Sequence, residues 1–166
     1  MTAQEMLDKL LRAYEVYYNV EKRNPAPPFT AEAVFRSHEE QYFLIRSARL
    51  SEAESNEYVY FALEESLTVP RLRALDGAAW NAARARISPH RDHRNSDVTL
   101  LILSSRIDPD ALALVPKMKH YQSYHFGFQG WSHYRLAAVE AESGHLVCNR
   151  QAKTLQKFLK RNLDLR

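Results

Sequence analysis

Cysteine is almost absent from this chain, since Cys148 is the only one among 166 residues. A lone cysteine excludes an internal disulfide and fits a reducing compartment, so we expect a cytoplasmic protein. Cys148 closes a short apolar stretch and has no activating partner nearby in the sequence. We therefore expect its thiol to be buried and inert.

Long apolar runs are also missing, and nothing approaches the roughly 18 consecutive apolar residues of a membrane span. The N-terminal sequence MTAQEMLDKLLRAYE carries acids and lacks the basic-then-apolar layout of a signal peptide. A membrane is therefore not an expected partner. Glycine is scarce as well, with four in the chain, so glycines are expected where φ is positive or where no Cβ fits.

Common catalytic and cofactor-binding motifs are absent too. The chain contains no GxGxxG, GxxxxGK, GxSxG or HExxH sequence. No catalytic residue and no cofactor are therefore predicted. The net charge of +3 and the pI near 9.0 permit an anionic partner, but such a modest excess is ordinary for a soluble protein.

The composition that remains is that of one globular domain over residues 1–166. Apolar residues make up 45% of the chain and charged residues 26%. A chain of this length buries enough surface to fold without disulfides. The local patterns predict an α/β (or α+β) domain with a mixed sheet and the element order α-β-β-β-α-β-α-β-β-α.

The first half of the chain predicts a helix followed by an antiparallel meander. Ala3–Tyr18 has helical apolar spacing after a capping box formed by Thr2 and Glu5, and the proline-rich segment Asn24–Pro28 ends it. Three runs rich in Val, Ile, Phe and Tyr follow with short polar breaks, as expected for neighbouring antiparallel strands: Thr30–His38, Tyr42–Leu50 and Tyr58–Glu65. A second helix begins after Thr68, with a proline in its first turn.

The second half predicts a parallel crossover. Val98–Leu103 is almost wholly apolar, which is typical of a central strand buried on both faces. A short helix from Asp108 leads to a strand over Trp131–Ala141, and a helix-bearing connection of this kind usually makes its two strands parallel. The remaining elements place helices on both faces of the sheet: a turn at Gly144, a hairpin strand Leu146–Cys148 and a final helix Arg150–Leu163 capped by Asn149.

The segment Tyr124–Trp131, YHFGFQGW, has an unusual composition of aromatic residues and glycines. One interpretation is a binding loop, in which Gly127 and Gly130 let a ligand approach closely while the neighbouring side chains contact it: His125, Phe126, Phe128 and Trp131. The alternative is structural, with the two glycines shaping the entry into the strand and the aromatic rings capping the core.

His90 and His93 flank Asp92 in the polar sequence PHRDH, and imidazoles with a carboxylate suit a transition metal. The adjacent Arg91 and Arg94 repel a cation, so no bound metal is predicted. A small-ligand or enzyme interpretation places a site at the C-terminal ends of the parallel strands, where ligands tend to bind in open α/β sheets. Its candidate residues are His90, His93, Ser104, Asp108 and the YHFGFQGW loop.

The first six elements, α-β-β-β-α-β, resemble in topology the core of the restriction-endonuclease-like nucleases. The resemblance implies an acid on the second strand and an acid-x-Lys on the third, which hold a divalent metal. Here Tyr42–Leu50 has no acid and the third strand has no lysine, so it implies at most a nucleic-acid-binding protein without cleavage activity. The basic residues of the last helix would meet phosphates, but a solvated helix face also accounts for them: Lys153, Lys157, Lys160 and Arg161.

Over most of its length the chain resembles a family of small bacterial proteins of unknown function. The resemblance rests on PHRDH, on the cluster Phe126-Gly127-Phe128-x-Gly130-Trp131, and on Asn149 ahead of a basic helix. This family brings no assigned activity. We therefore expect a non-enzymatic cytoplasmic binding or interaction protein, with a homodimer as one candidate assembly. Small-ligand binding and nucleic-acid binding stay open as alternatives.

Overall fold

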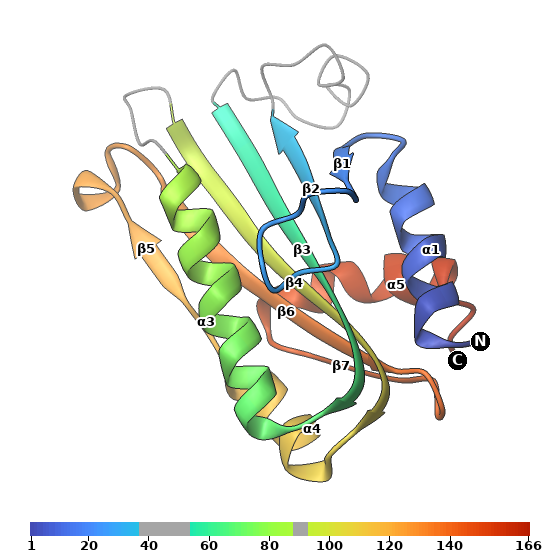
Figure 1. Cartoon of the computed structure of the whole chain (residues 1–166). Helices are drawn as coiled ribbons and strands as arrows, with labels where there is room; N and C mark the ends of the chain where they lie inside the picture. The colour runs from blue at the N-terminus through green and yellow to red at the C-terminus, as the bar shows by residue number, and fades with distance from the viewer. Residues whose placement is uncertain (37–53, 88–92) are drawn as a thin grey trace.

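The structure, a computed structural model, describes residues 1–36, 54–87 and 93–166. Within these ranges the chain forms one mixed sheet of seven strands, with helices on both faces (Figure 1). The strands are β1 (Asn19–Glu21), β2 (Ala31–Arg36), β3 (Glu54–Leu67), β4 (His93–Ile107), β5 (Tyr121–Ser123), β6 (Trp131–Glu140) and β7 (His145–Cys148). The α-helices are α1 (Ala3–Tyr14), α3 (Val69–Arg86), α4 (Pro109–Leu114) and α5 (Gln156–Asn162). The predicted α/β class is confirmed.

Strand β4 occupies the centre of the sheet, whose order is β1-β2-β3-β4-β6-β5, with β7 also pairing with β6. Both neighbours of β4 run parallel to it. The segment Val98–Leu103 is buried throughout, as its apolar composition predicts. The connections that return the chain between these parallel strands carry α3 and α4. The predicted central strand and the parallel pairing of β4 with β6 are confirmed.

A three-stranded antiparallel meander is present, but one of its members differs from the prediction. β2 pairs with β3 along one edge and with β1 along the other. The predicted middle strand of the meander, Tyr42–Leu50, lies outside the described residues. The third member, β1, comes from a segment with no apolar alternation, Asn19-Val-Glu21. A strand of three residues is too short to show a sequence pattern.

Helix α1 begins as predicted and ends four residues early. The Glu5 N–H donates to the Thr2 hydroxyl (3.1 Å), and the Thr2 N–H donates to the Glu5 carboxylate (2.7 Å), which completes the capping box. The helix ends at Tyr14, and Tyr18 beyond it reaches the sheet. Its ring packs edge-on against Tyr14 (4.8 Å), and its hydroxyl donates to Glu57 (2.5 Å).

Each face of the sheet packs against its own helix layer. On one face, α3 and α4 cover alternate residues of the central strands, including Leu100 and Ile102. On the other, α1 and α5 cover the intervening residues, including Leu101 and Leu103. This division explains why the run from Val98 to Leu103 contains no polar residue except Thr99.

The last helical segment is anchored by a buried asparagine. The side-chain oxygen of Asn149 accepts from the Leu136 N–H (3.1 Å) and from the Ala152 N–H (3.0 Å) at the start of the 3-10 turn Gln151–Leu155, whose N-cap is Arg150. The predicted helix Arg150–Leu163 is this turn followed by α5. Its amide donates to the Met118 and Tyr134 carbonyls (3.1 and 3.0 Å). In α5 and its neighbouring turns, Leu159 and Leu163 face inward.

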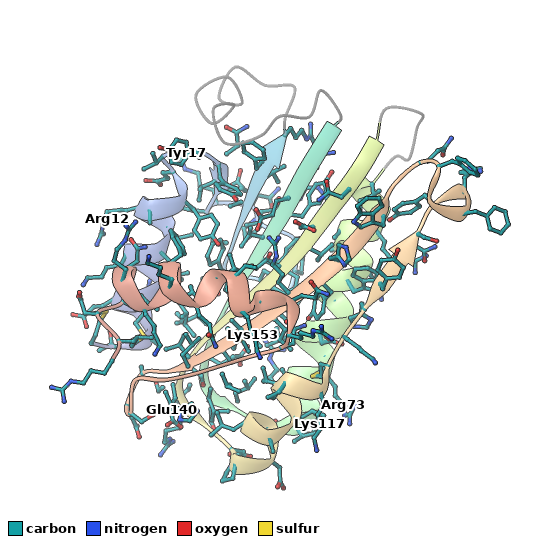
Figure 2. The ribbon with its side chains drawn as sticks, turned by 180° about the vertical axis from the view of Figure 1, so that it is seen from behind. Arg12, Tyr17, Arg73, Lys117, Glu140 and Lys153 are labelled. Carbon is teal, nitrogen blue, oxygen red and sulfur yellow. The ribbon has the colours of Figure 1, made fainter. Side chains whose placement is uncertain are left out.

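The first and last helices share one layer. α1 and α5 pack on the same face of the sheet, and Lys9 forms an ion pair with Asp164 (2.6 Å) beside them. Figure 2 views the molecule from this side, with α5 crossing the strands and Lys153 near its start. None of the helices described here is both long and apolar enough to span a bilayer.

Candidate functional site

The residues predicted to form one site lie at two ends of the sheet. β6 runs parallel to β4, with Asn95 opposite Trp131 and Ser104 opposite Glu140. The loop Tyr124–Gly130 directly precedes β6, so it lies where β4 begins, whereas Ser104 lies where β4 ends (Figure 1). The nine-residue offset between these pairs corresponds to roughly 30 Å at about 3.3 Å per residue. The structure therefore does not bring these residues into one site, because a parallel crossover returns the chain to its starting end.

Ser104 and Asp108 belong to an end of the sheet that is closed by internal hydrogen bonds. Ser104 is fully buried, and its hydroxyl donates to the Arg106 carbonyl (2.5 Å). The Ile107 N–H donates to the Glu140 carboxylate (2.8 Å). Asp108 is exposed at the start of α4. These contacts give Ser104 a structural role at the C-terminal end of β4, whereas the Asp108 side chain makes no capping hydrogen bond to α4.

The two histidines of PHRDH fall mostly outside the described residues. His90 lies outside them, and so does the side chain of His93, whose backbone begins β4 at the same end as Trp131. Across residues 1–36, 54–87 and 93–166, no three His, Cys, Asp or Glu side chains are placed to hold a metal ion. The absence of a metal at PHRDH stays a prediction.

The loop Tyr124–Gly130 is closed by its own backbone hydrogen bonds. The Tyr124 N–H donates to the Gly130 carbonyl (2.9 Å), and the Gly127 N–H donates to the Tyr124 carbonyl (3.0 Å). The Tyr124 hydroxyl shares a hydrogen bond with the buried Ser132 hydroxyl (2.9 Å). The loop is therefore tied to the sheet by Tyr124 at its base.

Both glycines of this loop have positive φ, as predicted, with Gly127 at +89° and Gly130 at +83°. His125 and Phe126 also have positive φ, at +47° and +55°. A side chain in this region costs about 1–2 kcal/mol per residue. The space beside Gly127 is open, so the backbone conformation rather than a neighbouring atom favours glycine there.

The loop presents its two phenylalanines to water. Phe126 is 100% exposed and Phe128 is 80% exposed, whereas Tyr121 on β5 is 61% exposed and Trp131 is 37% exposed. We call these four residues the aromatic surface. The interpretation in which all the rings cap the core is wrong for Phe126 and Phe128, because neither packs inward. His133, opposite Tyr121, lies between the Tyr121 ring (5.3 Å) and the Trp131 ring (6.3 Å).

A network of charged side chains continues from His133 across the same face of the sheet. Glu57, Asp97 and His133 are paired in register across β3, β4 and β6. Arg135 bridges the two acids, with its guanidinium donating to Glu57 (3.3 Å) and to Asp97 (2.7 Å). We call Glu57, Asp97 and Arg135 the carboxylate–arginine network.

Glu57 has donors at both carboxylate oxygens. One oxygen accepts from Arg135 and from the Thr99 hydroxyl (3.1 Å), and the other accepts from the Tyr18 hydroxyl (2.5 Å). Burial, together with the Glu57 carboxylate, raises the pKa of Tyr18 well above its ordinary value, so Tyr18 remains a neutral donor. Sequence analysis missed this network because it depends on the register of three strands that are far apart in the chain.

A second polar pair lies on the α3 face. His120 Nε2 lies 2.9 Å from the Asp76 carboxylate, and its ring stacks on Trp80 (5.0 Å, 13° between planes). Tyr134 lies edge-on to His120 (4.8 Å). Burial and the Asp76 carboxylate raise the pKa of Tyr134 well above its ordinary value. This pair ties α3 to the segment before β5, and the positions are too distant in sequence for a pattern to reveal them.

The basic residues weighed for nucleic-acid binding are divided between the two faces. Lys153, Lys157, Lys160 and Arg161 are exposed along the last helical segment, on the α1 and α5 side. Arg84 is exposed on α3, which covers the opposite face. Arg84 and Lys157 therefore lie on opposite faces of the sheet, and Arg91, which would connect them in a basic stripe, lies outside the described residues.

Comparison with known proteins gives one match. Residues 2–161 match the model of a family described as "Domain of unknown function (DUF8052)". No curated protein and no solved structure matches the chain. The expected resemblance to a family of unknown function is confirmed, while its bacterial origin stays a prediction.

Proposed function

The chain belongs to this family of unknown function, and from its surface we propose that it is a non-enzymatic binding protein that recognises another macromolecule through the aromatic surface. The observation that carries the proposal is the exposure of Phe126 and Phe128 on a hydrogen-bonded loop. Scattered exposed apolar residues are normal, but here four rings gather on one short stretch of chain.

The energetics favour a partner for these rings. Fully burying one phenylalanine stabilises a complex by about 1.5–3 kcal/mol. Aromatic side chains of this kind are enriched at the centres of interfaces. Because the loop backbone is closed by hydrogen bonds between Tyr124, Gly127 and Gly130, little backbone freedom is left to lose on binding.

The buried charges support a binding role over a catalytic one. A general acid or base must reach the substrate proton within hydrogen-bond distance. Glu57 already accepts from Tyr18, Thr99 and Arg135, so its carboxylate ties the segment after α1 to the sheet. A cytoplasmic location is part of the same proposal, and the buried free thiol of Cys148 fits a reducing compartment.

Site-specific photo-crosslinking inside cells that make the protein tests the proposal. A benzophenone amino acid is placed at position 126, and the matched control carries it at position 17. Tyr17 is 44% exposed and lies near the end of α1, across the sheet from β5 (Figure 2). We expect discrete covalent adducts from position 126 and none of the same mass from position 17. Identical patterns from both positions, or no adduct from position 126, would show that the aromatic surface is not a recognition surface.

A further inference from the structure

The outer edge of β5 carries backbone groups that point away from the sheet. The Tyr124–Gly130 hydrogen bond continues the β5–β6 ladder, in which hydrogen-bonded and non-hydrogen-bonded pairs alternate. Gln122 opposite Ser132 is then the next hydrogen-bonded pair. The N–H and C=O groups of Tyr121 and Ser123 consequently point outward, at the last strand of the described sheet. The Ser123 carbonyl also accepts from the exposed side-chain amide of Gln122 (2.9 Å), which leaves its second lone pair for a partner strand.

The side chains beside this edge are arranged on one face. Tyr121 lies opposite His133, and Ser123 lies opposite Trp131. In register, these four residues therefore form a small patch of three rings and one hydroxyl, next to the loop that exposes Phe126.

We propose that the partner recognised by the aromatic surface is a second copy of this chain, which pairs with it edge to edge through antiparallel β5 strands about a two-fold axis. The inference rests on the proposed function and names the partner. Two-fold symmetry is geometrically possible because Tyr121 and Ser123 each carry one outward N–H and one outward C=O. Tyr121 of each copy can therefore pair with Ser123 of the other. Tyr121 of one copy then lies beside Ser123 of the other, between its own His133 and the other copy's Trp131.

The available area fits a dimer that uses both the edge and the rings. An aromatic side chain buries about 150–250 Å², so the exposed fractions of Tyr121, Phe126, Phe128 and Trp131 amount to roughly 400–700 Å² per copy. A stable interface needs about 800 Å² per partner, and the paired backbone edges supply the remainder. The three-residue edge gives any partner strand few main-chain hydrogen bonds, so the occupant must also cover the exposed rings, which an extended peptide without rings of its own does poorly. A second copy brings its own rings.

Proline at position 123 is the sharpest test. Ser123→Pro removes one outward N–H from an edge strand, a position where proline is tolerated. Ser123→Thr keeps that N–H and is the matched control. Light scattering after size-exclusion chromatography is expected to give twice the 19.3 kDa chain mass for the parent protein and for Ser123→Thr. Ser123→Pro is expected to elute as a single chain with the far-UV circular dichroism of the parent.

A second variant tests the dimer without changing the backbone of β5. The double substitution Phe126→Ser with Phe128→Ser is expected to raise the dimer Kd at least about tenfold, whereas Tyr17→Ser leaves it unchanged. A parent protein that is monomeric at every concentration, or a Ser123→Pro variant that dimerises like the parent, overturns the inference. Crosslinks from position 126 to a different protein, with a monomeric parent, would refute the dimer and leave the proposed function standing.

Discussion

The two ends of the parallel strands differ in what they expose. At the C-terminal end, Ser104 and Glu140 form hydrogen bonds with other groups of the same chain. At the N-terminal end, the loop before β6 holds Phe126 in water. Binding sites in open α/β sheets usually lie at the C-terminal ends of the strands. In this protein the apolar surface available for recognition lies at the opposite end, because the loop that carries it enters β6 rather than leaving it.

The largest expected effect comes from the middle of the sheet, which supports both ends. Leu101 and Ile102 are buried against opposite helix layers. Leu101→Ala and Ile102→Ala should each lower the free energy of unfolding by about 2–5 kcal/mol, measured by urea denaturation. Similar losses at both sites are expected, since both faces of β4 are covered. A loss below about 1 kcal/mol at both sites contradicts the central position of β4.

The next largest effect is expected at the N-terminal end. Arg135→Met leaves Glu57 and Asp97 without their shared cation, as two carboxylates in neighbouring strands. We expect a loss of about 3 kcal/mol, at the lower end for a broken buried ion pair because the guanidinium is partly exposed. Arg135→Lys keeps the charge and should be distinctly milder. Equal stability of all three proteins would show that the network does not hold this end together.

A smaller effect is expected in the loop itself. Gly130 has a φ of +83°, so Gly130→Ala should destabilise the protein by about 1–2 kcal/mol and change the fluorescence of the adjacent Trp131. Thermal melts and emission spectra measure the two effects. An Ala variant that melts and fluoresces like the parent would mean that the loop relaxes without strain.

The smallest effect is expected at the C-terminal end. Hydrogen bonds from Ser143 and from the Ile107 N–H lower the pKa of Glu140 below its ordinary value. A lowered folded pKa gives stability that is present above the unfolded pKa of about 4.3 and is lost as the pH falls through the folded value. Glu140→Gln should therefore cost less than about 1 kcal/mol at pH 7, because the side chain is largely solvated, and less still at pH 3. Urea titrations at the two pH values test this, and an equal or larger loss at pH 3 would contradict it.

Features encoded within one short stretch were predictable from sequence. Local chemistry alone predicts three features: the Thr2–Glu5 capping box, the buried strand segment Val98–Leu103, and the positive φ of Gly127 and Gly130. Strands β1 and β5 were not predictable, because three residues are too few for a period.

The candidate site was predictable only in part, because side-chain neighbours across the sheet depend on register. YHFGFQGW is unusual in composition, but its predicted place at the C-terminal ends of the strands is wrong. The parallel pairing of β4 with β6, which the sequence does predict, puts a loop that enters β6 at the N-terminal ends. The carboxylate–arginine network requires Glu57 and Arg135, which are 78 positions apart, to meet over one strand. No local pattern contains that information.

The layer made by α1 and α5 has a consequence for folding during synthesis. Leu7 and Leu10 reach the ribosome exit early, but Leu159 and Leu163, which share their layer, emerge about 150 residues later. At about 5–20 residues per second, the apolar face of α1 waits roughly 8–30 seconds for these partners. The order of synthesis therefore leaves the Leu7 and Leu10 side of α1 without its final covering until the last helix is complete.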